Sequence, residues 1–341
     1  MKKSLMTLGV LALFVLMAYG QEKKFALYSV AFYNMENLFD TIHDEGKNDY
    51  EYLPNGTNQW NTMKYKAKLK NMSEILSMLS TDKLPMGPAI SGVSEIENYR
   101  VLEDILKQPV LADRGYQYVH YEGADQRGVD CAFFYNPKLF ELTNSKLVPY
   151  VYINDTVHKT RGFLIASGNI AGEKMHFIVN HWPSRAAASP ARERAGEQVR
   201  AIKDSLLRED SAAKIVIMGD MNDDPMDKSM AVALGAKRKP ADVGPTDLYN
   251  PWWDTLKKGY GTLMYKGKWN LFDQIVFTGN LLGTDRSTLK FYKHEIFRRD
   301  FMFQKEGKYK GYPKRTQAGG VWLNGYSDHL PTIIYLIKEV K

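Results

Sequence analysis

The chain has 341 residues, 44% of them hydrophobic, and its 46 basic and 39 acidic residues give a formal charge of +7 at pH 7. A chain of this length and apolar content can bury a sizeable core. Its single cysteine, Cys131, excludes an intramolecular disulfide, so the core must supply the stability.

The first twenty residues, MKKSLMTLGVLALFVLMAYG, place two lysines before an apolar stretch that ends in Ala18 and Gly20. This order is typical of a secretory signal peptide at residues 1–20. A retained anchor is the alternative, but the stretch is short for a span of about 20 residues. We therefore expect a secreted or periplasmic protein with no stable membrane anchor after cleavage. Loss of Lys2 and Lys3 lowers the charge to +5, which suits an anionic substrate.

The remainder, residues 21–341, is predicted to form a single domain, because no Pro, Gly or Ser tract and no internal repeat divides it. Short apolar runs rich in β-forming residues predict buried strands. In chain order they cover residues 25–34, 87–96, 129–137, 174–182, 214–222, 271–278 and 331–337. Between them, residues 69–79 and 195–206 carry apolar side chains at helical spacing. Strands that alternate with helices predict a layered α/β fold.

Polar side chains recur where these predicted strands end. They are Asn34, Glu95, His181, Asp220, Asn222, Asp273, Asp328 and His329. Each has an ordinary explanation when it is read alone: Asn34 could cap a helix starting at Met35, and His329 could be a core histidine. Carboxylates, carboxamides and two histidines at successive strand ends together indicate one cleft, because a strand end can hold a side chain rigidly while its tip remains accessible.

The motifs YNMEN, GVSEIEN, NHWPSR, GDMNDDP, LFDQI and YSDHLP closely resemble those of the endonuclease/exonuclease/phosphatase family, which includes pancreatic-type deoxyribonuclease. The resemblance spans almost the whole mature chain and is greatest to the secreted bacterial branch. It implies a four-layer sandwich, in which two packed mixed β-sheets are flanked by helices and the active site lies at one edge of the sheets. It also implies a divalent metal ion, usually magnesium.

The residues themselves agree with such a metal. Hard oxygen ligands without a cysteine cluster suit Mg²⁺ or Mn²⁺ better than a closed structural zinc site. Glu95 is the first predicted ligand, and Asn34 and Asp328 would complete the metal site directly or through water.

Hydrolysis also needs a proton carrier, and two residues compete for that role. His329 fits it if Asp273 orients the imidazole, because a carboxylate on one ring nitrogen raises the basicity of the other. Asp220 is the competing base. Asn222 follows it by two residues, so on an extended segment both side chains would point the same way, with Asn222 facing a phosphate oxygen.

The remaining candidates would bind the substrate phosphate. His181 would donate to it if a nearby acid raised its pKa, and Glu122 is the predicted partner. Arg127 and Arg185 could each bind phosphate bidentately, or could equally form ordinary ion pairs.

Residues 291–315, FYKHEIFRRDFMFQKEGKYKGYPKR, interleave aromatic and basic side chains, as expected where bases stack and phosphates are neutralised. Trp182 and Trp269 could contact substrate or simply pack. The sequence therefore predicts a secreted metal-dependent phosphodiesterase that acts on DNA or RNA. The alternatives are a lipid-directed phosphoesterase, such as a sphingomyelinase-like phospholipase C or an inositol phosphatase, and a binding module that has lost the chemistry. No feature specifies the oligomeric state.

Overall fold

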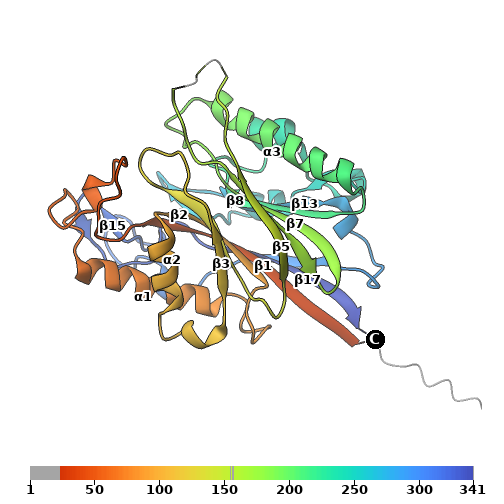
Figure 1. Ribbon diagram of the computed structural model, residues 1–341, viewed down its shortest axis with the longest axis horizontal. Coiled ribbons are helices and arrows are strands. Elements are labelled where there is room, and N and C mark those ends of the chain that lie inside the picture. Colours follow the sequence, from red (N-terminus) through yellow and green to blue (C-terminus); the bar gives the residue numbers. More distant parts are fainter. Residues whose placement is uncertain (1–23, 154, 156, 341) are drawn as a thin grey trace, which may run out of the picture.

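Two mixed β-sheets form the centre of the computed structural model, which describes residues 24–153, 155 and 157–340 (Figure 1). The predicted signal peptide lies outside the described residues. The first sheet has the strand order β14-β17-β1-β2-β4-β3. Its strands are β1 (Lys24–Leu38), β2 (Ile90–Ile96), β3 (Gln117–His120), β4 (Asp130–Tyr135), β14 (Lys290–Ile296) and β17 (Thr332–Val340). The central strand β1 runs parallel to β2 and antiparallel to β17.

The second sheet has the order β5-β6-β7-β8-β13-β10-β9. Its strands are β5 (Glu141–Val148), β6 (Phe163–Ile170), β7 (Glu173–His181), β8 (Lys214–Asp220), β9 (Ala236–Lys237), β10 (Leu248–Tyr249) and β13 (Asp273–Thr278). Two short antiparallel pairs stand apart from both sheets. They are β11 (Leu263–Tyr265) with β12 (Lys268–Asn270), and β15 (Gln317–Ala318) with β16 (Val321–Trp322).

The three longest helices begin where the sequence supplies a cap or a proline. Asn61 accepts a hydrogen bond from the backbone N–H of Lys64 at the start of α1, and a proline occupies the first turn of α3. The α-helices are α1 (Thr62–Met78), α2 (Tyr99–Leu106), α3 (Ser189–Glu209) and α4 (Trp253–Lys257). Shorter helical turns are η1 (Tyr50–Tyr52), η2 (Ala112–Arg114), η3 (Ser229–Leu234), η4 (Pro240–Asp242), η5 (Gly279–Leu281) and η6 (Asp300–Met302). None of the described helices is both long and apolar enough to span a membrane.

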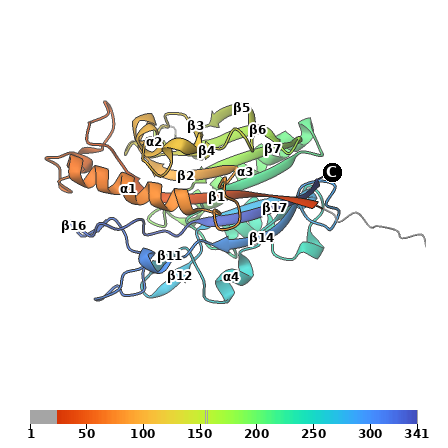
Figure 2. The ribbon, with the colours of Figure 1, turned by 90° about the horizontal axis from the view of Figure 1, so that it is seen from below.

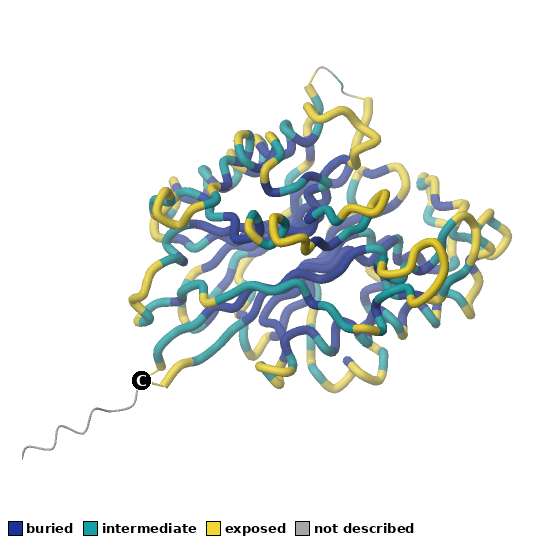
Figure 3. Tube along the Cα trace, turned by 180° about the vertical axis from the view of Figure 1, so that it is seen from behind, coloured by how far each residue is buried: buried dark blue, intermediate teal, exposed yellow. Residues whose placement is uncertain are grey.

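Three hydrophobic clusters explain how the layers stack. The inner cluster joins the facing sides of the two sheets, for example Phe32 and Phe133 from the first with Phe177 and Val216 from the second. A second cluster packs α1 and α2 on the outer side of the first sheet, and a third packs α3 on the outer side of the second. Figure 1 shows α3 on one side of the sheets and α1 and α2 on the other. Figure 2 shows β1, β17 and β14 side by side, and Figure 3 shows buried residues concentrated in the interior. The predicted four-layer sandwich is confirmed.

All seven predicted strands and both predicted helices are present, and the alternative explanation of Asn34 as a helix cap does not hold. No helix begins at Met35, because β1 continues to Leu38. Glu36 and Asn37 adopt left-handed backbone angles there, with φ of 45° and 53°, and the pairing with β2 shifts between Asn34 and Leu38. This irregularity turns the chain at the edge of the sheet where the predicted site lies.

Candidate active site

Three neighbouring strands of the second sheet align reactive side chains at one edge. The parallel strands β7 and β8 end together at His181 and Asp220, which pair in register. The antiparallel strand β13 begins opposite them, with Asp273 paired to Asp220. Residues that are far apart in sequence are therefore neighbours because the strands carrying them are hydrogen-bonded in this order.

The first sheet contributes Asn34 from β1 and Glu95 from β2, two parallel neighbours. The side-chain amide of Asn34 donates to Oε1 of Glu95 at 3.2 Å and to Oδ2 of Asp220 at 3.0 Å. Asn34 is completely buried, so these two bonds join the sheets at the floor of the site.

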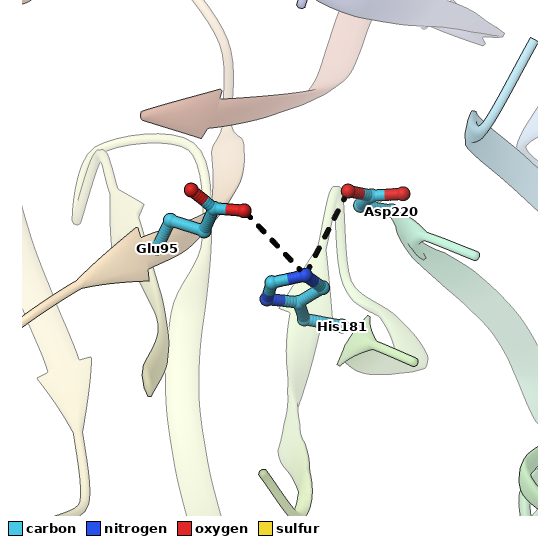
Figure 4. A group of neighbouring side chains, drawn as sticks. All are labelled: Glu95, His181 and Asp220. Carbon is cyan, nitrogen blue, oxygen red and sulfur yellow. Dashed lines mark ion pairs between the residues drawn. The ribbon is translucent and has the colours of Figure 1, made fainter. Parts of the chain in front are cut away.

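Glu95 and Asp220 lie on either side of one histidine (Figure 4). Nε2 of His181 is 3.6 Å from Oε1 of Glu95 and 3.8 Å from Oδ2 of Asp220. Glu95 has a left-handed backbone, with φ of 57°, and the backbone N–H of Asn37 donates to its Oε2 at 3.0 Å. Such backbone strain in a residue other than glycine is common at functional sites, where the surrounding structure holds it in place.

The predicted pair of His329 and Asp273 is present, with Nδ1 lying 2.7 Å from Oδ2. Burial disfavours the charged imidazolium, but the carboxylates of Asp273 and Asp220 outweigh it and raise the pKa of His329 well above its usual value. Burial also raises the pKa of Asp220 to about 7, although the nearby His329 opposes that rise. Two groups with perturbed pKa values therefore face the same space.

The predicted rise in the pKa of His181 is wrong. Burial, together with the positive charges of Arg161 and Arg127, lowers the pKa of His181 well below its usual value. Glu122 does not pair with it, because its carboxylate is 57% exposed and lies 4.0 Å from Nδ1 of His120 instead. The carboxylates that approach Nε2 of His181 among the described residues are those of Glu95 and Asp220.

Asn222 reaches the same cavity as Asp220 by a different backbone from the extended one expected. Its φ is 51°, and its N–H donates to Oδ1 of Asp220 at 2.9 Å. Its side-chain amide donates to the carbonyl of Trp182 at 3.0 Å. Trp182 itself is buried and packs in the cluster beneath α3, whereas Trp269 packs at the edge of the opposite outer cluster.

Asp328 belongs to a partly buried ionic network that the sequence did not reveal. Nη2 of Arg315 lies 3.0 Å from Oδ2 of Asp328, and Nε of the same arginine lies 2.8 Å from Oε1 of Glu36. Lys68, on α1, hydrogen-bonds to Thr316 and to the carbonyl of Tyr326 beneath them. Burial and the nearby Asp328 raise the pKa of Glu36 to about 7. The sequence did not identify Glu36 as part of the site, because its position resembled the first turn of a helix.

The two predicted phosphate-binding arginines differ. Arg185 does not line the cavity that holds the reactive side chains, and its guanidinium lies 2.8 Å from Asp227, 3.3 Å from Asp223 and 4.4 Å from the ring centroid of Phe272. The ion-pair alternative therefore describes Arg185. Arg127 does line that cavity, with its side chain half exposed. So does Arg161, a buried arginine that sequence analysis missed because it lies outside the recognised motifs.

The basic and aromatic stretch at residues 291–315 is partly structural. The guanidinium of Arg298 lies over three rings, 4.9 Å from Trp269, 5.0 Å from Phe303 and 5.5 Å from Tyr260. Lys305 and Lys310, by contrast, are exposed beside a surface hollow. Only part of this stretch is therefore available to a substrate.

The reactive side chains line one cavity, and a second cavity lies next to them. We call the larger one, of about 580 Å³, the arginine cavity; it contains Glu95, His181, Asp220, Asn222 and His329 together with Arg127 and Arg161. The smaller, of about 360 Å³, is the aromatic cavity. Its lining includes Glu36, Asn37, Tyr52, Trp60, Tyr309 and Arg315. Asn37 donates to Glu95 and Arg315 contacts Asp328, so the aromatic cavity adjoins the same centre from the other side.

The donor atoms fit a divalent cation. One potential ligand atom from each of Glu95, His181 and Asp220 lies within 4.8 Å of the others, and the same holds for Asp220, Asp273 and His329. Carboxylate oxygens with a neighbouring carboxamide are the ligands that hard cations prefer. The buried Nδ1 of His181 and Oδ1 of Asp273 have no hydrogen-bond partner in the described part of the chain, as expected of a site that is completed by other groups.

The sequence profile of the endonuclease/exonuclease/phosphatase family matches residues 29–338. The chain belongs to this family. Members of the family are metal-dependent phosphoric ester hydrolases, so the protein is an enzyme of that class. No curated protein matches its sequence.

Solved structures show the same fold at low sequence identity. A family member from Bacteroides thetaiotaomicron is 14% identical, with a TM-score of 0.58 over 93% of this chain and 97% of that one. The mannosyl-6-phosphatase from the same organism is also 14% identical, with a TM-score of 0.56 over 91% and 99%. D. rerio TDP2, complexed with a single-strand DNA product, is 14% identical, with a TM-score of 0.53 over 91% and 99%.

Proposed function

We propose that this protein is a secreted, divalent-metal-dependent phosphodiesterase that cleaves DNA or RNA, with Mg²⁺ or Mn²⁺ as its metal. The observation that carries this proposal is that the reactive side chains line the arginine cavity and that the aromatic cavity adjoins them through Asn37 and Arg315. A phosphodiester has a substituent on each side of its phosphorus, so a second cavity beside the reactive one could hold a substituent that a terminal phosphate lacks. Export would depend on the predicted signal peptide.

A divalent cation bound by Glu95, with Asn34 and Asp328 completing its ligands, would neutralise charge that builds on the phosphoryl oxygens. Side chains of the protein would bind the phosphate and transfer the protons. Asn222 and His181 face the arginine cavity, where they would hold the phosphate oxygens. Asp220 and His329 would transfer the protons, one activating the attacking water and the other serving the leaving oxygen. Asp273 orients the His329 ring through the hydrogen bond at Nδ1.

Nucleic acid is the proposed substrate class because its features match several parts of this surface. The aromatic cavity offers Tyr309 and Tyr52 to a base, and the exposed Lys305 and Lys310 lie in the same segment as Tyr309. The DNA product bound to D. rerio TDP2 shows that this fold can carry such a substrate.

One observation favours a lipid-directed enzyme as the second candidate. The connection between β5 and β6 contributes Tyr152, Thr160 and Arg161 to the arginine cavity. The same connection exposes Val151 by 55%, Ile153 by 65% and Val157 by 77%. Exposed apolar side chains beside a catalytic cavity could contact a bilayer.

A substrate panel separates the two candidates. Purified protein with Mg²⁺ would be incubated with single-stranded DNA, duplex DNA, RNA, sphingomyelin vesicles, mannose 6-phosphate and bis(4-nitrophenyl) phosphate, each with and without chelator. We expect chelator-sensitive cleavage of nucleic acid and of the chromogenic diester. Cleavage of vesicles with DNA and RNA left intact would refute the nuclease proposal, and full activity in excess chelator would refute the metal.

A further inference from the structure

The aromatic cavity is built from three segments that meet beside the reactive side chains. They are the end of β1, the connection from β1 to α1, and the stretch from Tyr309 to the β15–β16 hairpin. The backbone N–H of Asn37, in the lining of this cavity, donates to Oε2 of Glu95 at 3.0 Å. A substituent of a phosphate bound beside Glu95 can therefore enter the aromatic cavity.

The two cavities differ in charge. The arginine cavity is lined by the two arginines after which it is named. In the aromatic cavity, the guanidinium of Arg315 is already paired with Glu36 at 2.8 Å and with Asp328 at 3.0 Å. Glu51 adds a further carboxylate to the lining. Because charge of one sign repels a ligand of the same sign, the phosphate favours the arginine cavity and the aromatic cavity suits an uncharged ring.

The wall formed by residues 50–60 is held in shape by its own contacts. The backbone N–H of Asn58 donates to the carbonyl of Glu51 at 3.2 Å and closes one turn of this wall. The ring of Tyr52 stacks on that of Phe39, with centroids 4.2 Å apart. A lining that is ordered before a ligand arrives lowers the entropic cost of binding.

The wall formed by the β15–β16 hairpin has no side chain at its turn. Gly319 and Gly320 have φ of 57° and 79°, the left-handed angles of a tight two-residue turn. A Cβ added to either would meet no other atom within 4 Å, so the hairpin presents bare backbone to the cavity. Tyr309, which is 51% exposed, adds an aromatic ring to the lining. Nucleic-acid bases stack on exposed rings of this kind.

The size of the aromatic cavity limits what it can hold. Its volume of about 360 Å³ lies at the lower end of the range of roughly 300–1,000 Å³ for small-molecule sites. This space suits one base with its sugar and is too small for a base pair with its two backbones. A base that enters it must therefore be unpaired, and unpairing a base in a duplex costs free energy.

Glu51 is an acceptor that can read the edge of such a base. Its Oε2 lies 3.5 Å from the side-chain amide of Asn58, at the limit of a hydrogen bond, so the carboxylate keeps its capacity to accept. Unpaired bases are recognised on their pairing edges. Guanine presents neighbouring N–H donors at N1 and N2 on this edge, which match both oxygens of a carboxylate. Adenine and cytosine place an acceptor beside their donor, and thymine and uracil place one on each side.

We propose that the aromatic cavity is a specificity subsite for the base of one unpaired nucleotide joined to the phosphate being cleaved, and that Glu51 makes guanine the preferred base. This inference rests on the proposed nuclease function and adds two properties to it. Single strands are cleaved in preference to duplexes, and cleavage occurs next to guanine.

The test uses oligothymidylates that carry a single guanine, adenine or cytosine at the centre, each as a single strand and annealed to its complement. Mass spectrometry of the products locates the cuts, and kcat/KM is measured for each substrate with Mg²⁺. We expect cleavage next to guanine to exceed cleavage elsewhere by roughly 10-fold to 100-fold, the discrimination typical of a bidentate contact with a base. The duplexes should be cleaved at least about 10-fold more slowly, because the base must first be unpaired.

Glu51→Gln separates base recognition from a structural role. Glutamine offers one acceptor and one donor, which match the donor and acceptor of adenine, so the preferred base should change from guanine to adenine. Loss of a merely structural contact would lower the rates on all substrates together. Glu45→Gln is the matched control, because Glu45 is an exposed residue of the same connection and is not part of the cavity lining. It should keep the preference for guanine.

Tyr309→Ala provides a second variant at an exposed position. We expect it to raise KM for single strands by roughly 10-fold, through the loss of one stacked ring. An unchanged KM in this variant would overturn the inference. A preference for guanine that persists in folded Glu51→Gln would also overturn it.

Bis(4-nitrophenyl) phosphate, which carries no base, separates this inference from the proposed function. A protein that cleaves this diester and no oligonucleotide would refute the nuclease proposal and the inference with it. Cleavage of oligonucleotides without preference for guanine or for single strands would refute the inference alone.

Discussion

Nε2 of His329 and Oδ2 of Asp220 lie 3.8 Å apart, so the two candidate proton carriers face each other across one gap. The hydrogen bond from His329 to Asp273 uses the other ring nitrogen, which leaves Nε2 as the atom that can exchange a proton with substrate or water. This geometry makes the division of roles between the two residues measurable.

We predict that His329→Ala lowers kcat by roughly 100-fold to 10,000-fold at saturating metal, the range typical of a lost general acid or base. The concentration of Mg²⁺ that gives half-maximal activity should change little, because the predicted metal ligands remain. Steady-state kinetics on a chromogenic diester at several metal concentrations provides the measurement. Near-normal turnover in this variant, with a large loss in Asp220→Asn, would assign the base to Asp220 alone.

Glu95→Gln, by contrast, should mainly weaken the dependence of activity on Mg²⁺ rather than lower kcat at saturating metal. Its carboxylate is the first predicted ligand, and loss even of an outer-shell partner of a metal ligand costs about 10-fold to 100-fold in metal affinity. We therefore expect the half-maximal Mg²⁺ concentration to rise at least about 10-fold. Glu122→Gln is the matched control, because Glu122 is largely exposed and pairs with His120. Isothermal titration with Mg²⁺ measures binding directly, and equal affinities for the wild type and Glu95→Gln would remove Glu95 from the metal site.

The exposed lysines predict a salt effect on nucleic-acid binding. Lysines that neutralise phosphates release counterions, so affinity falls with rising salt. Replacing Lys305 and Lys310 with glutamine should weaken binding to all DNA sequences alike. It should also reduce the slope of log K against log salt by roughly one for each lysine that contacts a phosphate. Fluorescence anisotropy with a labelled single strand in Ca²⁺ would measure it. An unchanged slope would place the DNA elsewhere on the protein.

His294 predicts how stability depends on pH. Burial and the nearby Lys258 lower its pKa to about 4, from an ordinary value of 6.5, while its Nε2 lies 2.9 Å from the hydroxyl of Thr255. The unfolded chain therefore binds a proton before the folded protein does, so stability falls as the pH drops from 6.5 towards 4. The full effect is roughly 3 kcal/mol, since one pKa unit corresponds to about 1.4 kcal/mol.

Urea unfolding of the wild type and His294→Gln at pH 7, 5.5 and 4.5 tests this effect. The difference between the two proteins should shift in favour of the variant as the pH falls. Parallel pH dependences would show that His294 does not contribute.

The sequence was sufficient for the buried strands because their apolar runs have no helical period, and buried strands of this kind need no alternation. It was not sufficient for edge strands such as β5 and β14, whose side chains are mostly exposed or half-buried. β5 is a strand because it pairs with β6, and β14 is a strand because it pairs with β17. No local sequence pattern predicts this pairing.

The same distinction applies to the site. His329 and Asp273 were predictable as a pair because Asp273 begins a buried strand, His329 lies three residues before another, and both belong to recognisable motifs. The sequence did not decide whether Arg185 binds phosphate or forms ion pairs. The aspartates that pair with it belong to a different motif, and only the folded structure brings them close to it. Glu36 and Arg161 were missed because their roles depend on tertiary features, a left-handed backbone in one case and burial against Asp125 in the other.

The pairing of β1 with β17 limits how early the protein can fold during synthesis. Lys24 pairs with Val340 and Phe32 with Thr332, so the central strand of the first sheet waits for a partner at the far end of the sequence. His329 and Asp328 directly precede that partner, so the ribosome must release almost the whole chain before the site can assemble. Nascent chains would thus lack hydrolytic activity until the last strand has been synthesised. The adjacent strand ends also make this edge a place where a circular permutant could be joined with little distortion.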